Sequence, residues 1–162
     1  MGLNASKRVE TALTSSPEFD AVCEAEFERC LAEAQHAFPG VRRYQLVDAA
    51  ASLHASLSGA IPLVRRWVPD PPARAQVDAA FRRAIPSSTE DLDPAEFRAF
   101  AADLFRDAVL AGAGRAVLRR VPIGVAGISG LGLVTRAGTQ VVASVVGVYA
   151  VGVATGVYLS LS

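Results

Sequence analysis

Gly2 and Ser6 have the spacing of an N-myristoylation signal. The first residues read Met1-Gly2-x-x-x-Ser6, which satisfies the acceptor pattern once Met1 has been removed. Glycine is required because the reaction acylates a free and unhindered amine. We therefore predict lipidation at Gly2, within a flexible N-terminus at residues 1–15; the alternative is a frayed and unmodified start. A single myristoyl chain binds a membrane only marginally, so a second attachment is expected.

The C-terminal segment is the candidate for that second attachment. Residues 139–162 carry no charge, and as a helix they would extend about 36 Å, enough to cross a hydrocarbon core of about 30 Å. Small residues let membrane helices pack closely, and the candidates for such packing are Gly147, Gly152 and Gly156. We predict a glycine-rich hydrophobic tail over residues 121–162 with a transmembrane helix at 139–162. Insertion of residues 121–135 is left open, and buried Val-rich strands are the alternative.

Charge is balanced over the whole chain but unevenly distributed along it. Sixteen basic and sixteen acidic residues give a formal net charge of zero, which lacks the positive excess typical of nucleic-acid binders. Every acidic residue lies at or before Asp107, whereas four arginines follow it: Arg115, Arg119, Arg120 and Arg136. The expected partners are therefore membrane lipid and either another protein or a second copy joined through the tail, but no nucleic acid.

Early acidic residues and the lack of an apolar run after Met1 argue against a signal peptide. We therefore expect the protein to lie at the cytosolic face of a membrane of unknown kind.

The cysteines and histidines do not form a catalytic or metal-binding set. Cys23 and Cys30 are seven residues apart, which on a helix puts them on one face but about two turns apart, too far for a disulfide. We expect both thiols to be buried in the core. His36 and His54 have no partners at ligand spacing. Without a Gly-rich phosphate loop or a Ser-His-acid set, we predict neither an enzyme nor a cofactor site.

Apolar residues recur at helical spacing through the segment between the two ends. Ser16 as N-cap and Pro17 at the first helical position predict a helix to about Ala37, which Pro39-Gly40 ends. A second helix is expected over residues 44–57. Together they form a first helix-loop-helix unit.

A second unit follows the proline break at Pro69-Asp70-Pro71-Pro72. Asp70 is the predicted cap of a helix that ends near residue 84. Asp93-Pro94-Ala95-Glu96 then predicts another helix start, because Asp93 and Glu96 have the spacing of a reciprocal capping box. That helix is expected to reach the region of Gly112 and Gly114. The predicted body, residues 16–120, is therefore all-α.

The segment between these last two helices resembles an EF-hand calcium loop. Residues 85–96 have its length of twelve, with an apolar Leu92 at the eighth position, Asp93 at the ninth and Glu96 at the twelfth. The chain is similar in particular to small plant proteins of the EF-hand-like class that begin with the same acylation signal. The resemblance implies a pair of EF-hand-like units, with the first loop, at residues 38–48, as a structural partner.

Several loop positions depart from that family. The resemblance implies oxygen ligands at five positions: Ser87, Thr89, Asp91 through its carbonyl, Asp93 and Glu96. The first position, however, is Ile85, which offers no side-chain oxygen, and the sixth is Glu90 where the family has glycine. The loop is therefore expected to be degenerate, with weak or absent calcium binding.

These features combine into one functional expectation. We expect a membrane-tethered EF-hand-like binding or regulatory protein. The alternative is a structural membrane protein that oligomerises through its glycine-rich transmembrane helix. Binding of a partner by the body without its tail would distinguish the two.

Overall fold

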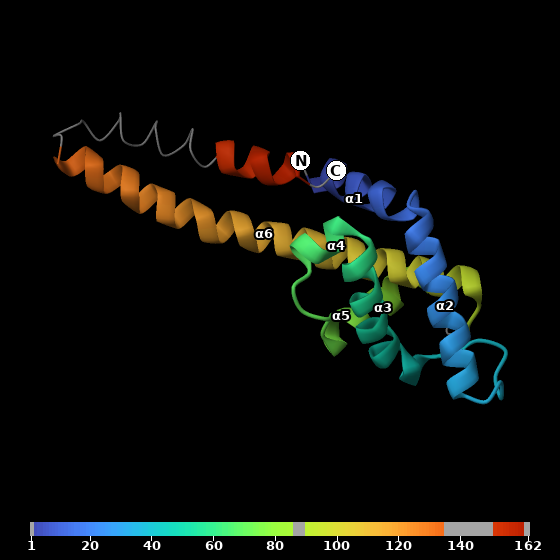
Figure 1. The fold of residues 1–162 in the computed structure, drawn as a ribbon. Coiled ribbons are helices and arrows are strands. Elements are labelled where there is room, and N and C mark those ends of the chain that lie inside the picture. The colour runs from blue at the N-terminus through green and yellow to red at the C-terminus, as the bar shows by residue number, and fades with distance from the viewer. Residues whose placement is uncertain (1, 86–89, 135–150, 161–162) are drawn as a thin grey trace. The chain divides into compact units, whose positions relative to one another are not determined.

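The residues that the structure describes are mostly helical, which confirms the predicted all-α class. The computed structural model describes residues 2–85, 90–134 and 151–160, with the backbone alone at residues 2–3 and 120–134. Two compact units divide the chain, Met1–Leu110 and Ala111–Ser162. In chain order the elements are α1 (Gly2–Thr14), α2 (Pro17–Glu33), β1 (Val41–Arg42), η1 (Arg43–Gln45), α3 (Leu46–Ala60), α4 (Pro62–Trp67), α5 (Arg74–Ala84), β2 (Asp91–Leu92) and α6 (Pro94–Val134) (Figure 1).

The N-terminal segment, for which a flexible stretch at residues 1–15 was predicted, forms a helix over Gly2–Thr14. Val9 and Leu13, four residues apart on α1, are fully buried. The guanidinium of Arg98 on α6 donates a hydrogen bond to the carbonyl of Thr14 (3.1 Å). The short apolar face of α1 thus has a partner surface in the first unit, and its burial stabilises the helix.

The helix α2 begins at Pro17 after Ser16, as predicted, but it ends at Glu33 rather than near Ala37. Gln35 and His36 have left-handed backbone angles, with φ of 53° and 54°. Their amides donate to carbonyls one turn back, at Ala32 and Leu31 respectively (2.9 and 2.8 Å). These bonds satisfy the last carbonyls of α2, so the helix stops before Pro39-Gly40 is reached.

Two further helix boundaries differ from expectation. Asp70 does not cap α5; the N-cap is Ala73, whose amide donates to the side chain of Gln76 (2.8 Å). A carboxamide at the third helical position thus satisfies the helix start without a capping acid. α6 continues through Gly112 and Gly114 to Val134. Glycine lowers helix stability by about 1 kcal/mol per residue but does not by itself end a helix.

The core of the first unit is centred on aromatic side chains. The largest fully buried side chains include Phe19 of α2 and Phe97, Phe100 and Phe105 of α6. Phe27 contacts Phe97 edge-on, with ring centroids 5.8 Å apart. These contacts anchor the start of α6 against α2.

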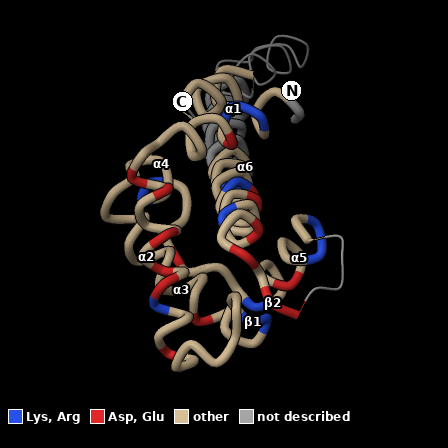
Figure 2. The backbone as a smooth tube through the Cα atoms, turned by 90° about the vertical axis from the view of Figure 1, so that its right-hand side faces the viewer, with Lys and Arg blue, Asp and Glu red and all other residues tan. Residues whose placement is uncertain are grey.

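The strands β1 and β2 join the two loops in a short antiparallel ladder (Figure 2). Val41 lies opposite Leu92, and Arg42 lies opposite Asp91. Val41 and Leu92 are both fully buried. The ladder therefore links the two helix-loop-helix units at the middle of their loops.

Within the described part of the chain, none of the helices combines the length and apolar character needed to cross a membrane. Most of the predicted transmembrane segment, 139–162, lies outside the described residues, as does Gly147. Residues 151–159 of that segment are helical. Gly152 and Gly156 lie in this helix, and a Cβ built at either would meet no atom within 4 Å.

Candidate functional site

The two paired loops have matching positions. Loop A (residues 34–45) and loop B (residues 85–96) each contain twelve residues, and each has its buried ladder residue, Val41 or Leu92, at the eighth position. The partner loop is thus shifted by four residues at its start from the predicted 38–48. The shift arises because α2 ends early, in the left-handed turn at Gln35 and His36.

The twelfth side chain performs the same role in each loop. In loop A, the amide of Arg42 donates to Gln45 Oε1 (3.0 Å). In loop B, the amide of Asp93 donates to Glu96 Oε2 (3.0 Å), and the amide of Glu96 donates to Asp93 Oδ1 (2.7 Å). These last two bonds confirm the predicted capping box. Both carboxylates of the box are therefore engaged with backbone at the start of α6.

Gln45 has a second contact that fixes loop A to α2. Its Nε2 donates to the carbonyl of Cys30 (2.8 Å), and its side chain is buried. The carboxamide thus accepts from the start of η1 and donates to the end of α2. A carboxylate could not make both bonds, because it has no donor.

Gly40 brings the two loops into backbone contact. A Cβ built on Gly40 would lie 2.3 Å from the carbonyl oxygen of Leu92 and 2.9 Å from its carbonyl carbon. Those are backbone atoms and cannot rotate away. Only a glycine allows this approach.

Arg42 supplies a positive charge to the acidic residues of loop B. Its Nη1 donates to Glu90 Oε2 (2.8 Å), and its Nε forms an ion pair with Asp91 Oδ1 (2.7 Å) without the alignment of a hydrogen bond. The guanidinium also stacks over the ring of Phe38 at 4.0 Å. Loop A thus places one cation against two carboxylates of loop B.

The predicted ligand residues do not form a metal centre among the described residues. Ser87 and Thr89 lie outside the described residues. The carboxylates of Asp93 and Glu96 accept backbone amides, and that of Asp91 is paired with Arg42. No group of three or more His, Cys, Asp or Glu side chains suited to a metal occurs in the described ranges. Ile85, the predicted first position, is buried.

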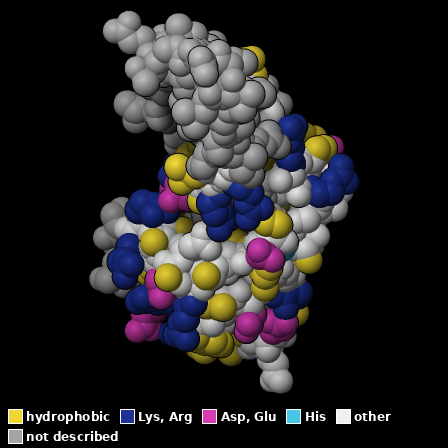
Figure 3. All heavy atoms as spheres, turned by 90° about the vertical axis from the view of Figure 1, so that its left-hand side faces the viewer, with side chains coloured by type: hydrophobic (Ala, Val, Ile, Leu, Met, Phe, Trp, Pro, Cys, Tyr) yellow, Lys and Arg dark blue, Asp and Glu magenta, His cyan; other side chains and the backbone are white. Residues whose placement is uncertain are grey.

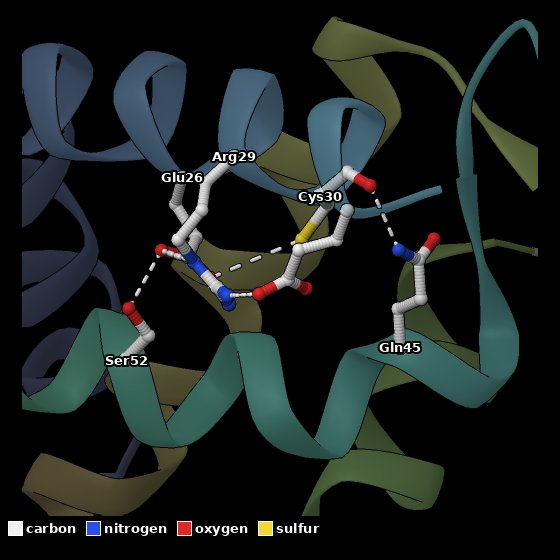
Figure 4. Close-up of polar contacts among 6 residues, drawn as sticks. Glu26, Arg29, Cys30, Gln45 and Ser52 are labelled. Carbon is white, nitrogen blue, oxygen red and sulfur yellow. Dashed lines mark hydrogen bonds and ion pairs between the residues drawn. The ribbon is translucent and has the colours of Figure 1, made fainter. Parts of the chain in front are cut away.

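A buried carboxylate between α2 and α3 was missed by sequence reasoning. Glu26 has only 6% of its surface exposed, and its Oε2 accepts a hydrogen bond from the hydroxyl of Ser52 on α3 (2.7 Å). Arg29 donates from Nε to both carboxylate oxygens (3.0 Å each) (Figure 4). The sequence signal was an acidic residue on the apolar side of α2, beside Phe27 and Cys30. The cluster fastens α2 to α3.

The two cysteines lie in the core as predicted. Both are free thiols and buried. Burial raises the pKa of Cys23 and of Cys30 to about 12, because the thiolate would lose its hydration. The neutral thiol is a poor nucleophile, so neither position supports thiol chemistry.

An open groove of about 950 Å³ lies beside the loops. Arg43 crosses it, 3.5 Å from Asp78 and over the ring of Phe81 at 5.1 Å. Tyr44, which also lines the groove, is 68% exposed. Its lining mixes apolar and charged side chains: Arg42, Arg43, Tyr44, Leu46, Val47, Asp48, Arg74, Val77, Asp78, Phe81 and Glu90. The arrangement suits contact with a peptide or protein surface.

Charges of both signs occur on the surface of the described residues. Figure 3 shows basic, acidic and hydrophobic side chains interspersed on one face of the described residues.

Comparison of the chain with protein-family models, curated proteins and solved structures finds no match.

Proposed function

We propose that this chain is a calcium-independent EF-hand-like binding module tethered to the cytosolic face of a membrane. The observation that carries the proposal is the antiparallel ladder between loops A and B, in which matching eighth positions, Val41 and Leu92, lie opposite each other. The repeated bond from the twelfth side chain to the ninth amide supports the same relation.

Arg42 supports calcium independence. Calcium binding in such a loop requires several free oxygen ligands and net negative charge. Here a guanidinium from loop A pairs with Glu90 and Asp91. The protein's own cation thus compensates the charge that a calcium ion would otherwise balance.

The groove between the start of α3 and α5 is the proposed binding surface. It exposes Tyr44 and, in part, Val47, together with charged neighbours. Burial of apolar side chains would supply affinity, and the charged rim would supply selectivity. Membrane attachment is assigned to acylated Gly2 and to the hydrophobic tail.

The second candidate is a structural membrane protein that oligomerises through its tail. In the helix at residues 151–159, Val151 and Leu159 are 64% and 59% exposed. The positions of Gly152 and Gly156 have open space where a Cβ would lie. Such a surface admits close approach of another helix.

Calcium titration of the full chain in detergent micelles tests the proposal. We expect no binding heat, or dissociation constants at or weaker than about 10⁻³ M. Glu96→Gln should weaken the capping box by about 1 kcal/mol and leave the calcium response unchanged. Glu28→Gln, at an exposed position of α2, is the matched control for loss of one acid. Micromolar binding that Glu96→Gln abolishes and Glu28→Gln preserves would instead make the protein a calcium sensor.

A further inference from the structure

Three exposed side chains form a strip on α6 in the second unit. Arg115 and Arg119 are four residues apart and Leu118 lies between them, so the three share one side of the helix. All are exposed, and Leu118, at 74%, is the most exposed large hydrophobic side chain among the described residues. We call these residues the α6 strip.

The α6 strip has no acidic partner within the described residues. Arg83 and Arg106 already bind Asp103 and Asp107, which are the last two acidic residues of the sequence. Neither cation of the strip makes a hydrogen bond or ion pair to another described side chain. Two cations that lack counter-charges attract anions from outside the chain.

The position of the strip along α6 indicates which anion it meets. The helix continues from the strip to Val134, and after Arg120 that stretch contains no charged residue. Arginines at the start of an uncharged helical stretch lie at headgroup depth when the stretch contacts lipid, and their stems together with a leucine can cover apolar surface there.

We propose that the α6 strip binds anionic lipid headgroups, so that membrane attachment depends on the charge of the leaflet. This inference deepens the proposed membrane tether and rests on it. Each arginine near an anionic surface strengthens binding about fivefold, so loss of both should weaken partition roughly thirtyfold.

Vesicle flotation of the full chain tests the inference. The probes are phosphatidylcholine vesicles and phosphatidylcholine vesicles with about one third phosphatidylserine. The wild type should partition more strongly into the anionic vesicles, and the preference should fall as salt rises. Arg115→Gln/Arg119→Gln should lose the preference, and Arg115→Lys/Arg119→Lys should keep it, because charge rather than guanidinium geometry attracts the headgroups.

The matched control is Arg65→Gln/Arg82→Gln, which removes two exposed arginines of the first unit. This control should retain the wild-type preference. Equal partition of the wild type into both vesicles, or an equal loss in strip and control variants, would overturn the inference while leaving membrane attachment intact. Failure of the wild type to bind either vesicle would overturn the proposed tether itself. Circular dichroism checks that every variant keeps its helix content.

Discussion

Gly40 is the residue at which the two loops touch. A methyl group there would meet the backbone of Leu92 at 2.3 Å, so the ladder would have to open or shift. We expect Gly40→Ala to lower the free energy of unfolding by about 1 to 3 kcal/mol, as for other insertions into packed sites. Chemical denaturation of the full chain in detergent measures the change.

Gly59 provides the control for that substitution. It lies in α3, and a Cβ built there meets no atom within 4 Å. Gly59→Ala should therefore stabilise the protein by up to about 1 kcal/mol through helix propensity. The contact between the loops would be disproved if both alanine variants changed stability in the same direction by similar amounts.

For single residues, the sequence predicted local side-chain hydrogen bonds better than close contacts between backbone segments. The capping box of Asp93 and Glu96 could be predicted because the two residues are only three positions apart in the sequence. Gly40 was interpreted only as the end of a helix. Its close approach to Leu92, 52 positions later, depends on how two distant loops pair, and a local pattern does not contain that information.

Among the elements, α2 and α3 are joined through a buried carboxylate. Glu26→Ala would remove the acceptor of the Ser52 hydroxyl and one of the two carboxylate partners of Arg29, which would keep its ion pair with Glu33. Because Arg29 is partly exposed and water can solvate it, we expect a loss of about 1 to 3 kcal/mol. Ser52→Ala, which removes one bond, should cost about 1 kcal/mol. Urea denaturation measures both.

A double-mutant cycle separates this bond from other effects of truncation. Glu26→Ala with Ser52→Ala should cost less than the sum of the two single changes, by at least about 0.5 kcal/mol. Glu24→Ala, at an exposed position of α2, should change stability by no more than about 0.5 kcal/mol. Strict additivity would show that the two side chains do not interact.

Element boundaries were predictable where a local signal existed. Pro17 and Pro94 mark the starts of α2 and α6, and both starts agree with expectation. α1 was missed because the first residues were interpreted as an acylation signal on a flexible N-terminus, although Val9 and Leu13 share one face of a helix. The end of α2 was misplaced because Gln35 and His36 adopt left-handed angles that are more typical of glycine.

At the scale of the whole molecule, the proposed acylation of Gly2 can be tested directly. We expect intact-mass spectrometry of protein from a eukaryotic host to show a myristoyl group on Gly2. Gly2→Ala should remove that mass and reduce membrane association, while the tail retains part of it. Gly59→Ala should leave both properties unchanged. An unmodified N-terminal amine in the wild-type protein would refute lipidation.

The all-α class followed from periodicity, whereas the arrangement of the loops depended on contacts far apart in sequence. Val41 pairs with Leu92, although the two residues lie in different loops that are separated by α3, α4 and α5 in the sequence. The ion pair between Arg42 and Asp91 became evident only from the ladder that brings the two loops together. The tail prediction at residues 139–162 falls mostly outside the described residues.

The packing of α1 also limits how an acylated protein could turn at a membrane. The thirteen-residue helix extends about 20 Å, and Arg98 links its end at Thr14 to α6 and also to Asp20 of α2. An acyl chain at Gly2 would therefore be attached to a packed helix and not to a flexible segment. The proposed acyl chain would then hold the first unit at a set distance and tilt from a membrane.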